Sequence, residues 1–320
     1  MGARRSDLPE FSCPFPVRRN PHAQDAEAFL RAALSRLGAD GHAAEHSGNA
    51  IGELAALAYP DVPAEHLRVA VLWLAWFWIH DDAWADKVPL GGADELRQVH
   101  LRAEQVLRGA SAVPSDHLSV RTLALLLEEI RALNPAWDTT AFRREVLRYL
   151  RSTLWELDLR LRGDLPSLFA YLQMRPIVAV CTAAREIDFL LCGLQLDPEL
   201  RKHPLVHLVD AAAANYGCWV NDLCSWGMEQ REGITSNLIT VARREFGWTH
   251  EQAVQWVVKV IQTEVDTFQQ LRRDLSSLIL PTLPLAEPDR AAEQLEHYLT
   301  HYEGWFVANA EWMSRTVRYR

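Results

Sequence analysis

The sequence predicts an all-α protein built around a large apolar core. From about residue 26 onward, apolar residues recur at spacings of three and four, the period of a helix with one buried face. No segment shows the sustained two-residue alternation of a half-buried strand. The chain has 320 residues, of which 49% are hydrophobic, and that is enough to bury a sizeable core. We therefore expect a bundle of helices without a sheet.

The expected elements follow one another between breaks that proline and glycine mark. Residues 1–25 contain four prolines and should form an extended N-terminal segment, because proline does not fit inside a helix. Residues 26–320 should form a single α-helical domain, since no low-complexity linker divides them and no fixed repeat indicates a helical solenoid. Breaks that leave roughly ten helices are expected near Pro60–Pro63, Pro89–Gly92, Pro114, Pro135, Gly163–Pro166, Pro198, Gly233 and Pro281–Pro288.

The composition argues against several classes of function. With 33 basic and 42 acidic residues the net charge is −9, so we expect no nucleic-acid partner and no anionic membrane surface. The longest apolar run, Val69–Ile79, is shorter than the roughly 20 residues of a membrane-spanning helix, so we expect no stable membrane insertion. The N-terminus lacks the apolar region of a signal peptide, and the five cysteines form no CxxC pair. These features predict a cytoplasmic protein.

Three carboxylates follow the most apolar helix of the chain. Residues 69–79 (VAVLWLAWFWI) are apolar all round, and Asp81, Asp82 and Asp86 come shortly after them. The helix dipole disfavours negative charge at a C-terminal end unless a cation compensates. A solvated helix end is one interpretation of this cluster. A site for a hard cation is the other, because Asp82 and Asp86 share a helix face and carboxylate oxygens suit Mg²⁺.

A second group of oxygen donors lies on one stripe of a later helix. Asn221, Ser225 and Glu229 stand at positions i, i+4 and i+8 of an otherwise apolar segment. Asn and Ser are poor residues for the middle of a helix, so their presence calls for a reason. The stripe either faces water or supplies an amide, a hydroxyl and a carboxylate oxygen to one cation.

These motifs resemble those of class I terpene synthases. The run Asn221-Asp222-x-x-Ser225-x-x-x-Glu229 matches the family's NSE metal-binding motif in full. The acidic run Asp81-Asp82-x-x-x-Asp86 is similar to its aspartate-rich motif, with the third acid one residue later than in the DDxxD form. The order of the two motifs along the chain also agrees with the family.

Three further segments carry the same resemblance. Residues 160–175 (RLRGDLPSLFAYLQMR) are similar to the stretch that leads to the family's diphosphate-sensing arginine, which is Arg175 here. The family's helix break after that arginine would then fall near residues 178–179. Arg318-Tyr319 resembles the terminal pair that hydrogen-bonds the diphosphate, and residues 11–23 (FSCPFPVRRNPHA) are similar to the N-terminal segment. The similarity therefore spans nearly the whole chain.

The resemblance implies a fold and a reaction. The fold would be a single-domain class I terpenoid synthase-like helical bundle around a central apolar active-site cavity. The reaction would be the Mg²⁺-dependent ionisation of a prenyl diphosphate, preferably farnesyl diphosphate, followed by carbocation cyclisation and release of diphosphate. Geranylgeranyl diphosphate, the substrate of a diterpene synthase, is the alternative. The enzyme would be a carbon–oxygen lyase acting on phosphates, and a monomer or a homodimer.

The resemblance also gives each candidate residue a role. Three Mg²⁺ ions would be held by Asp81, Asp82, Asp86, Asn221, Ser225 and Glu229. The diphosphate would be bound by Arg175, Arg318 and Tyr319, and planar guanidinium groups suit phosphate oxygens. Aromatic faces suit the walls of a carbocation pocket, and the expected lining residues are Phe77, Trp78, Trp305 and Trp312.

Other functions leave part of this pattern unexplained. A chain-elongating prenyltransferase would ordinarily carry a second aspartate-rich motif where this chain has the NSE run. His80-Asp81 could belong to an HD-type metal phosphohydrolase, which needs a further histidine and a distant aspartate at a transition metal. His297 and His301 could bind zinc, although a surface helix also explains their spacing. A non-catalytic relative could retain the motifs, and only an assay separates it from an enzyme.

Overall fold

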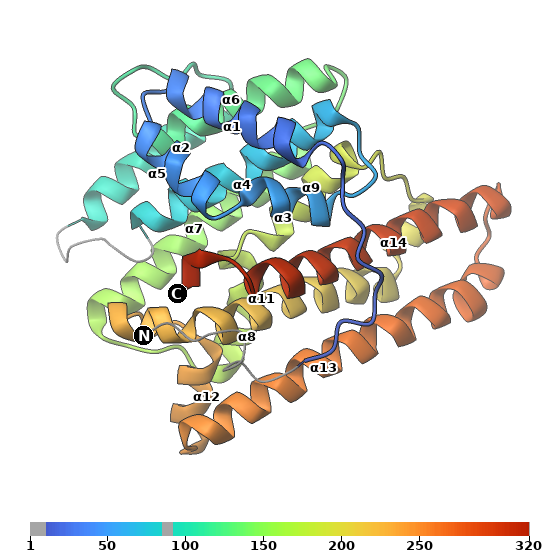
Figure 1. The fold of residues 1–320 in the computed structure, drawn as a ribbon. Helices are drawn as coiled ribbons and strands as arrows, with labels where there is room; N and C mark the ends of the chain where they lie inside the picture. Colours follow the sequence, from blue (N-terminus) through green and yellow to red (C-terminus); the bar gives the residue numbers. More distant parts are fainter. Residues whose placement is uncertain (1–10, 85–91, 320) are drawn as a thin grey trace. The chain divides into compact units, whose positions relative to one another are not determined.

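The computed structural model describes residues 11–84 and 92–319, and within these ranges the protein is helical and has no strand (Figure 1). The all-α prediction is confirmed. The helices are α1 (Ala23–Arg36), α2 (Asp40–Gly48), α3 (Ile51–Ala58), α4 (Ala64–Trp84), α5 (Ala93–Leu107), α6 (Leu118–Leu133), α7 (Thr140–Arg162), α8 (Leu168–Val178), α9 (Cys181–Leu191), α10 (Pro198–Lys202), α11 (Pro204–Glu232), α12 (Leu238–Phe246), α13 (His250–Asp274) and α14 (Pro288–Met313), with the short turns η2 (Leu275–Ile279), η3 (Leu280–Thr282) and η4 (Val317–Tyr319).

The chain forms two compact units. Unit 1 comprises the described parts of Met1–Arg19, Leu57–Pro60 and Cys192–Arg320. Unit 2 comprises Asn20–Ala56 and the described parts of Asp61–Leu191. The expectation that residues 26–320 form a single domain stays a prediction.

Unit 1 is organised around α11, its longest helix, which packs against α13 and α14 (Figure 1). Pro204 occupies the first turn, where its missing N–H costs nothing, and the ring of His203 accepts a hydrogen bond from the Leu205 N–H at 3.2 Å. The helix ends at Gly233, whose φ of 74° places it in the left-handed region that glycine adopts without strain. These signals give the chain one long helix on which the NSE residues lie.

The N-terminal segment is extended where the structure describes it, and no helix occurs in residues 11–22. The ring of Phe15 packs edge to face on those of Phe268 and Phe306 in unit 1, with centroid distances of 5.5 and 5.2 Å. The following helix, α1, begins at Ala23, slightly earlier than the sequence indicates. No proline follows Pro21 in this segment, so nothing prevents a helix from starting there.

Unit 2 contains the apolar helix that precedes the acidic residues. This helix, α4, packs against α1, α6 and α9. Trp73 and Trp76 are fully buried, and the indole N–H of Trp76 donates to the Ser119 carbonyl at 3.0 Å. The prediction of a helix buried on most sides is confirmed, because its bulky residues are covered by neighbouring helices.

Within the described ranges, the structure contains no helix whose length and apolar character would let it cross a membrane. None of the five cysteines forms a disulfide.

Candidate active site

The NSE residues lie along α11 in unit 1. Asn221 is half-buried, whereas Ser225 and Glu229 are buried. The Ser225 hydroxyl oxygen lies 2.6 Å from Glu229 Oε1 and 2.7 Å from the Asn221 carbonyl oxygen, so its single hydrogen serves one of them at a time. The three residues share one face of the helix, as their spacing predicts.

The C-terminal RY pair lies beside the first residue of this stripe. Tyr319 is buried on η4, and its hydroxyl accepts a hydrogen bond from Asn221 Nδ2 at 2.6 Å. The ring of Trp312 meets the Tyr319 ring edge to face, with centroids 6.3 Å apart. Arg318 is the half-buried neighbour of Tyr319 on the same turn. Unit 1 therefore brings Asn221 close to Tyr319, which lies 98 positions later in the sequence and packs on Trp312.

Helix α14 carries two further candidates in unit 1: Trp305, expected in the pocket wall, and His301, considered as a zinc ligand. Trp305 is half-buried, and its ring packs edge to face on Tyr59 at 5.5 Å. His301 is buried, and its Nδ1 lies 3.3 Å from the Cys192 sulfur. The surface-helix explanation is therefore wrong for His301, although His297 is exposed. The ring of His301 also stacks on that of Tyr59, with centroids 5.9 Å apart.

The start of α12 adds residues that the sequence reasoning missed. Asn237 is fully buried, and its Nδ2 donates to Glu229 Oε2 and to the Asp222 carbonyl, both at 2.8 Å. The Asp222 carboxylate in turn accepts the Leu238 N–H at 3.0 Å. Asn237 could have been recognised as a helix-capping residue before an apolar run, but no sequence signal links it to Glu229.

The aspartate-rich motif begins in the last turn of α4 in unit 2. Asp81 and Asp82 are half-buried at this end, and the last turn contains no basic residue. Asp86 lies outside the described residues. The neighbouring His80 is buried, and its Nε2 lies 3.2 Å from Nε2 of the buried His100. Burial lowers the pKa of both imidazoles, that of His100 to about 4, so the pair is neutral at pH 7.

Tyr149 on α7 is a second residue that the sequence reasoning missed. Its side chain is fully buried, and its pKa is raised first by burial and then by the negative charges of Asp81, Glu156 and Asp82. Phe77 is half-buried, and its ring meets the Tyr149 ring at 5.8 Å. Trp78 is buried on the same turn of α4 as Phe77. Phe77 and Trp78 thus lie about one helical turn before Asp81 and Asp82 on α4.

Arg175 lies in the last turn of α8, directly before a break in the backbone. The Arg175 carbonyl accepts a hydrogen bond from the Ala179 N–H at 2.8 Å. The helix contains Pro176 and continues for two more residues before it ends at Val178. Val180 is buried and has a φ of 58°, a left-handed conformation that is strained for a β-branched residue. The helix break expected near residues 178–179 is therefore present, and it is made by a valine.

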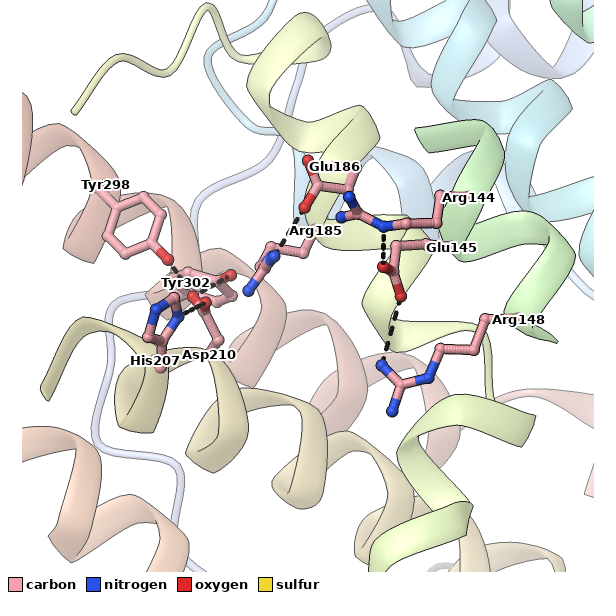
Figure 2. A network of polar contacts seen from close by, with 9 residues as sticks. All are labelled: Arg144, Glu145, Arg148, Arg185, Glu186, His207, Asp210, Tyr298 and Tyr302. Carbon is pink, nitrogen blue, oxygen red and sulfur yellow. Dashed lines mark hydrogen bonds and ion pairs between the residues drawn. The ribbon is translucent and has the colours of Figure 1, made fainter. Parts of the chain in front are cut away.

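Figure 2 shows polar contacts of both units, and one of them is the ion pair of Arg185 and Glu186 on α9 at 2.7 Å. In unit 2, Glu145 on α7 accepts from Arg144 at 3.0 Å and pairs with Arg148 at 3.5 Å. Burial alone would raise the pKa of Glu145, but the hydrogen bond from Arg144 and the charges of Arg148 and Arg144 outweigh it and lower this pKa. Glu145, Arg144 and Arg148 all lie on α7, which packs against α9 in the same unit.

The cluster of unit 1 surrounds Asp210 on α11. Tyr298 and Tyr302 of α14 both donate to this carboxylate, the latter at 2.8 Å, and His207 lies 3.9 Å away (Figure 2). Asp210 precedes Asn221 by three helical turns, which corresponds to roughly 16 Å along the axis. This cluster therefore ties α11 to α14 and is separate from the NSE stripe.

The donor chemistry of the NSE stripe fits a hard cation. Amide, hydroxyl and carboxylate oxygens are the ligands that Mg²⁺ accepts, and no sulfur or imidazole lies on the stripe. Among residues 11–84 and 92–319, no three His, Cys, Asp or Glu side chains gather as a metal site. The HD-type site therefore gains no support from the described part of the chain. The NSE stripe does not count among groups of three His, Cys, Asp or Glu side chains, because two of its three donors are the amide of Asn221 and the hydroxyl of Ser225.

The helical architecture is that of the class I terpene synthases. The crystal structure of germacradien-4-ol synthase from Streptomyces citricolor superimposes with a TM-score of 0.83 at 23% identity, covering 98% of this chain and all of that one. The crystal structure of α-eudesmol synthase superimposes with a TM-score of 0.81 at 22% identity, covering 95% and 98% of the two chains.

The sequence gives the family. Residues 72–267 match terpene synthase family 2, C-terminal metal binding, and the chain belongs to this family. It is 27% identical over 309 residues to the (+)-T-muurolol synthase ((2E,6E)-farnesyl diphosphate cyclizing) of Roseiflexus castenholzii, covering 96% of this chain and 92% of that protein. It is 26% identical to the germacrene A synthase of Nostoc punctiforme, covering 97% and 94%. The protein is a class I terpene synthase, an enzyme that cyclises prenyl diphosphates.

Proposed function

We propose that the protein is a sesquiterpene synthase that ionises farnesyl diphosphate with Mg²⁺ and cyclises the resulting carbocation, releasing diphosphate. The relatives from Roseiflexus castenholzii and Nostoc punctiforme support this choice, since the first is named for farnesyl diphosphate. A (−)-δ-cadinene synthase of Streptomyces clavuligerus, 25% identical over 307 residues, supports it as well. In reaction class the enzyme would be a carbon–oxygen lyase acting on phosphates. A diterpene synthase is not favoured.

The observation that carries this proposal is the NSE stripe. Asn221, Ser225 and Glu229 present three oxygen donors on one face of α11, and the terminal Tyr319 hydroxyl meets the first of them at 2.6 Å. We assign these three residues a role in binding three Mg²⁺ ions, and we assign the same role to Asp81, Asp82 and Asp86. Bound Mg²⁺ supplies Lewis-acid stabilisation of the negative charge that develops on the leaving diphosphate.

The protein's own groups would bind and orient the substrate. Arg175 and Arg318 would hold the diphosphate oxygens through charge-assisted hydrogen bonds, and the Tyr319 hydroxyl would donate a further one. These preorganised donors act on the charge that forms as the carbon–oxygen bond breaks, which lowers the barrier to ionisation. Tyr319 would exchange its hydrogen bond with Asn221 for one with the diphosphate.

The hydrocarbon part of the substrate needs apolar walls that exclude water. We assign Phe77, Trp78, Trp305 and Trp312 to these walls. Their aromatic faces cannot attack a carbocation, and each offers cation–π attraction of about 0.5–2 kcal/mol.

The cytoplasmic location and the choice between monomer and homodimer stay predictions from the sequence.

A substrate panel tests the proposal. Purified protein is incubated with Mg²⁺ and, separately, with the C10, C15 and C20 prenyl diphosphates. Diphosphate release is followed, and an organic extract is analysed by gas chromatography–mass spectrometry. We expect a cyclic product from the C15 substrate. A cyclic product from the C20 substrate alone would overturn the substrate assignment, and longer prenyl diphosphates formed only with added isopentenyl diphosphate would identify an elongating enzyme.

A further inference from the structure

The turn between α11 and α12 returns the chain onto the NSE stripe. Gly233 ends α11, and the Ile234 N–H donates back to the Glu229 carbonyl at 2.8 Å. Four residues after Gly233, Asn237 begins α12 in an extended backbone conformation, with φ −146° and ψ 140°. Its side chain has no exposed surface. A fully buried amide at this position must place its hydrogen bonds within the protein.

The Asn237 side-chain amide makes three hydrogen bonds, one through its oxygen and two through its nitrogen. Oδ1 accepts the Ile239 N–H at 2.9 Å, which caps the start of α12. Nδ2 carries two hydrogens, and they go to the Asp222 carbonyl and to Glu229 Oε2, each at 2.8 Å. The reverse orientation would turn the amide oxygen toward two acceptors. The amide orientation is therefore fixed by its partners.

Asp222 supports the same junction from the other side. Its side chain is fully buried, and its Oδ2 accepts the Leu238 N–H at 3.0 Å, at the N-terminus of α12. A helix N-terminus favours a carboxylate through its dipole and its unpaired N–H groups. The acid that follows Asn221 is thus directed at α12, and the junction fixes where Asn237 stands relative to α11.

The consequence for Glu229 is that its carboxylate is held in place. Oε1 lies 2.6 Å from the Ser225 hydroxyl, and Oε2 receives the Asn237 hydrogen bond. These two hydrogen bonds fix the orientation of the carboxylate on the NSE stripe. Partners that orient a metal-binding carboxylate typically change metal affinity or activity by about 10–100-fold when they are removed.

We infer that Asn237 is a positioning residue for Glu229, holding this carboxylate ready for Mg²⁺ in addition to capping α12. The inference rests on the proposed function of the NSE stripe. It assigns to the α11–α12 junction a part in metal binding, which neither the helix spacing nor the NSE motif contains.

Two substitutions separate positioning from capping. Asn237→Asp keeps an oxygen that can accept the Ile239 N–H, but it replaces the donor with an oxygen that faces the Glu229 carboxylate. Asn237→Ser also keeps a capping oxygen, and its side chain is too short to reach Glu229 and Asp222 together. Thr249→Ala is the matched control. It removes the side-chain cap of the neighbouring helix α13, where Thr249 accepts the Gln252 N–H at 3.2 Å.

The first readout is binding without catalysis. The melting temperature is measured as Mg²⁺ is titrated in the presence of inorganic diphosphate, which stabilises the folded protein by mass action. We expect both Asn237 variants to need about 10–100-fold more Mg²⁺ than wild type for half of the shift. Thr249→Ala should begin from a melting temperature lower by about 2 °C and respond to the same Mg²⁺ concentrations as wild type.

The second readout is the Mg²⁺ dependence of diphosphate release from farnesyl diphosphate. The variants should recover most of the wild-type kcat at high Mg²⁺, because a positioning defect raises the metal requirement more than it alters the bound state. Wild-type Mg²⁺ dependence in both Asn237 variants, with only a lower melting temperature, would show that Asn237 is a cap and overturn the inference.

The same titration keeps the inference apart from the proposed function. If Glu229→Gln abolishes the shift while both Asn237 variants behave as wild type, the NSE assignment stands and the role of Asn237 fails. If the wild-type protein shows no Mg²⁺-dependent shift with diphosphate, the proposed function fails, and the role of Asn237 fails with it.

Discussion

The left-handed valine after Arg175 allows the local backbone to be tested by a pair of matched substitutions. Val180 has a φ of 58° and is 5% exposed, whereas Val178, two residues earlier, is helical and 4% exposed. Each valine is changed to alanine and to glycine. At Val178, glycine should be less stable than alanine by about 0.5–1 kcal/mol for lost backbone freedom and by about 0.8 kcal/mol for the missing methyl group.

At Val180 the same losses are opposed by relief of strain. The left-handed conformation costs an L-residue about 1–2 kcal/mol, and glycine does not bear this cost. The glycine and alanine variants should therefore have nearly equal stability at position 180, while glycine is weaker by about 1.5 kcal/mol at position 178. Urea denaturation of the four variants measures both differences. An equal glycine deficit at the two positions would refute the claim that Val180 stores strain.

Three further substitutions test other parts of the account. Phe77→Ala should change the product mixture while diphosphate release stays within about tenfold of wild type, since the ring shapes the proposed pocket and binds no phosphate; an unchanged product profile by gas chromatography–mass spectrometry would remove it from the wall. Tyr149→Phe removes a buried hydroxyl that has no hydrogen-bond partner within the described chain and should raise the unfolding free energy by about 1 kcal/mol, and a loss of stability would reveal a partner. The pKa of Glu264 is raised by burial, against hydrogen bonds from Trp219 and Asn215, so its contribution to stability is greatest at low pH and falls as the pH rises through the raised pKa. Glu264→Gln keeps the acceptor oxygen and should gain stability relative to wild type as the pH rises above about 4.3, the ordinary pKa of a glutamate. A difference in urea denaturation that does not change with pH would contradict this.

Much of the fold follows from periodicity and breaks. The run before Asp81 is apolar on all sides, which the sequence shows directly. The structure explains this pattern, because the helix packs against α1, α6 and α9. Helical spacing likewise predicted one face for Asn221, Ser225 and Glu229, since contacts at i and i+4 depend on the helix alone. Features that lie within one helix can thus be predicted from sequence.

Features that join two helices could not be predicted in the same way. The bond from Asn237 to Glu229 depends on how the α11–α12 turn closes, and the approach of Tyr149 to Phe77 depends on how α7 packs. The conformation of Val180 was also invisible, because valine is the kind of residue that normally avoids positive φ. Tertiary packing determines all three.

The measurement that tests the central claim most directly compares wild type with Glu229→Gln on farnesyl diphosphate and Mg²⁺. Glu232→Gln, the same change at an exposed position at the end of α11, serves as the control. We predict that wild type and the control release diphosphate and form the same cyclic C15 product. Glu229→Gln should lose at least about 100-fold in rate with little change in melting temperature, because one charged metal ligand is gone. Turnover by Glu229→Gln near the wild-type rate would contradict the assignment of the NSE stripe as the metal site.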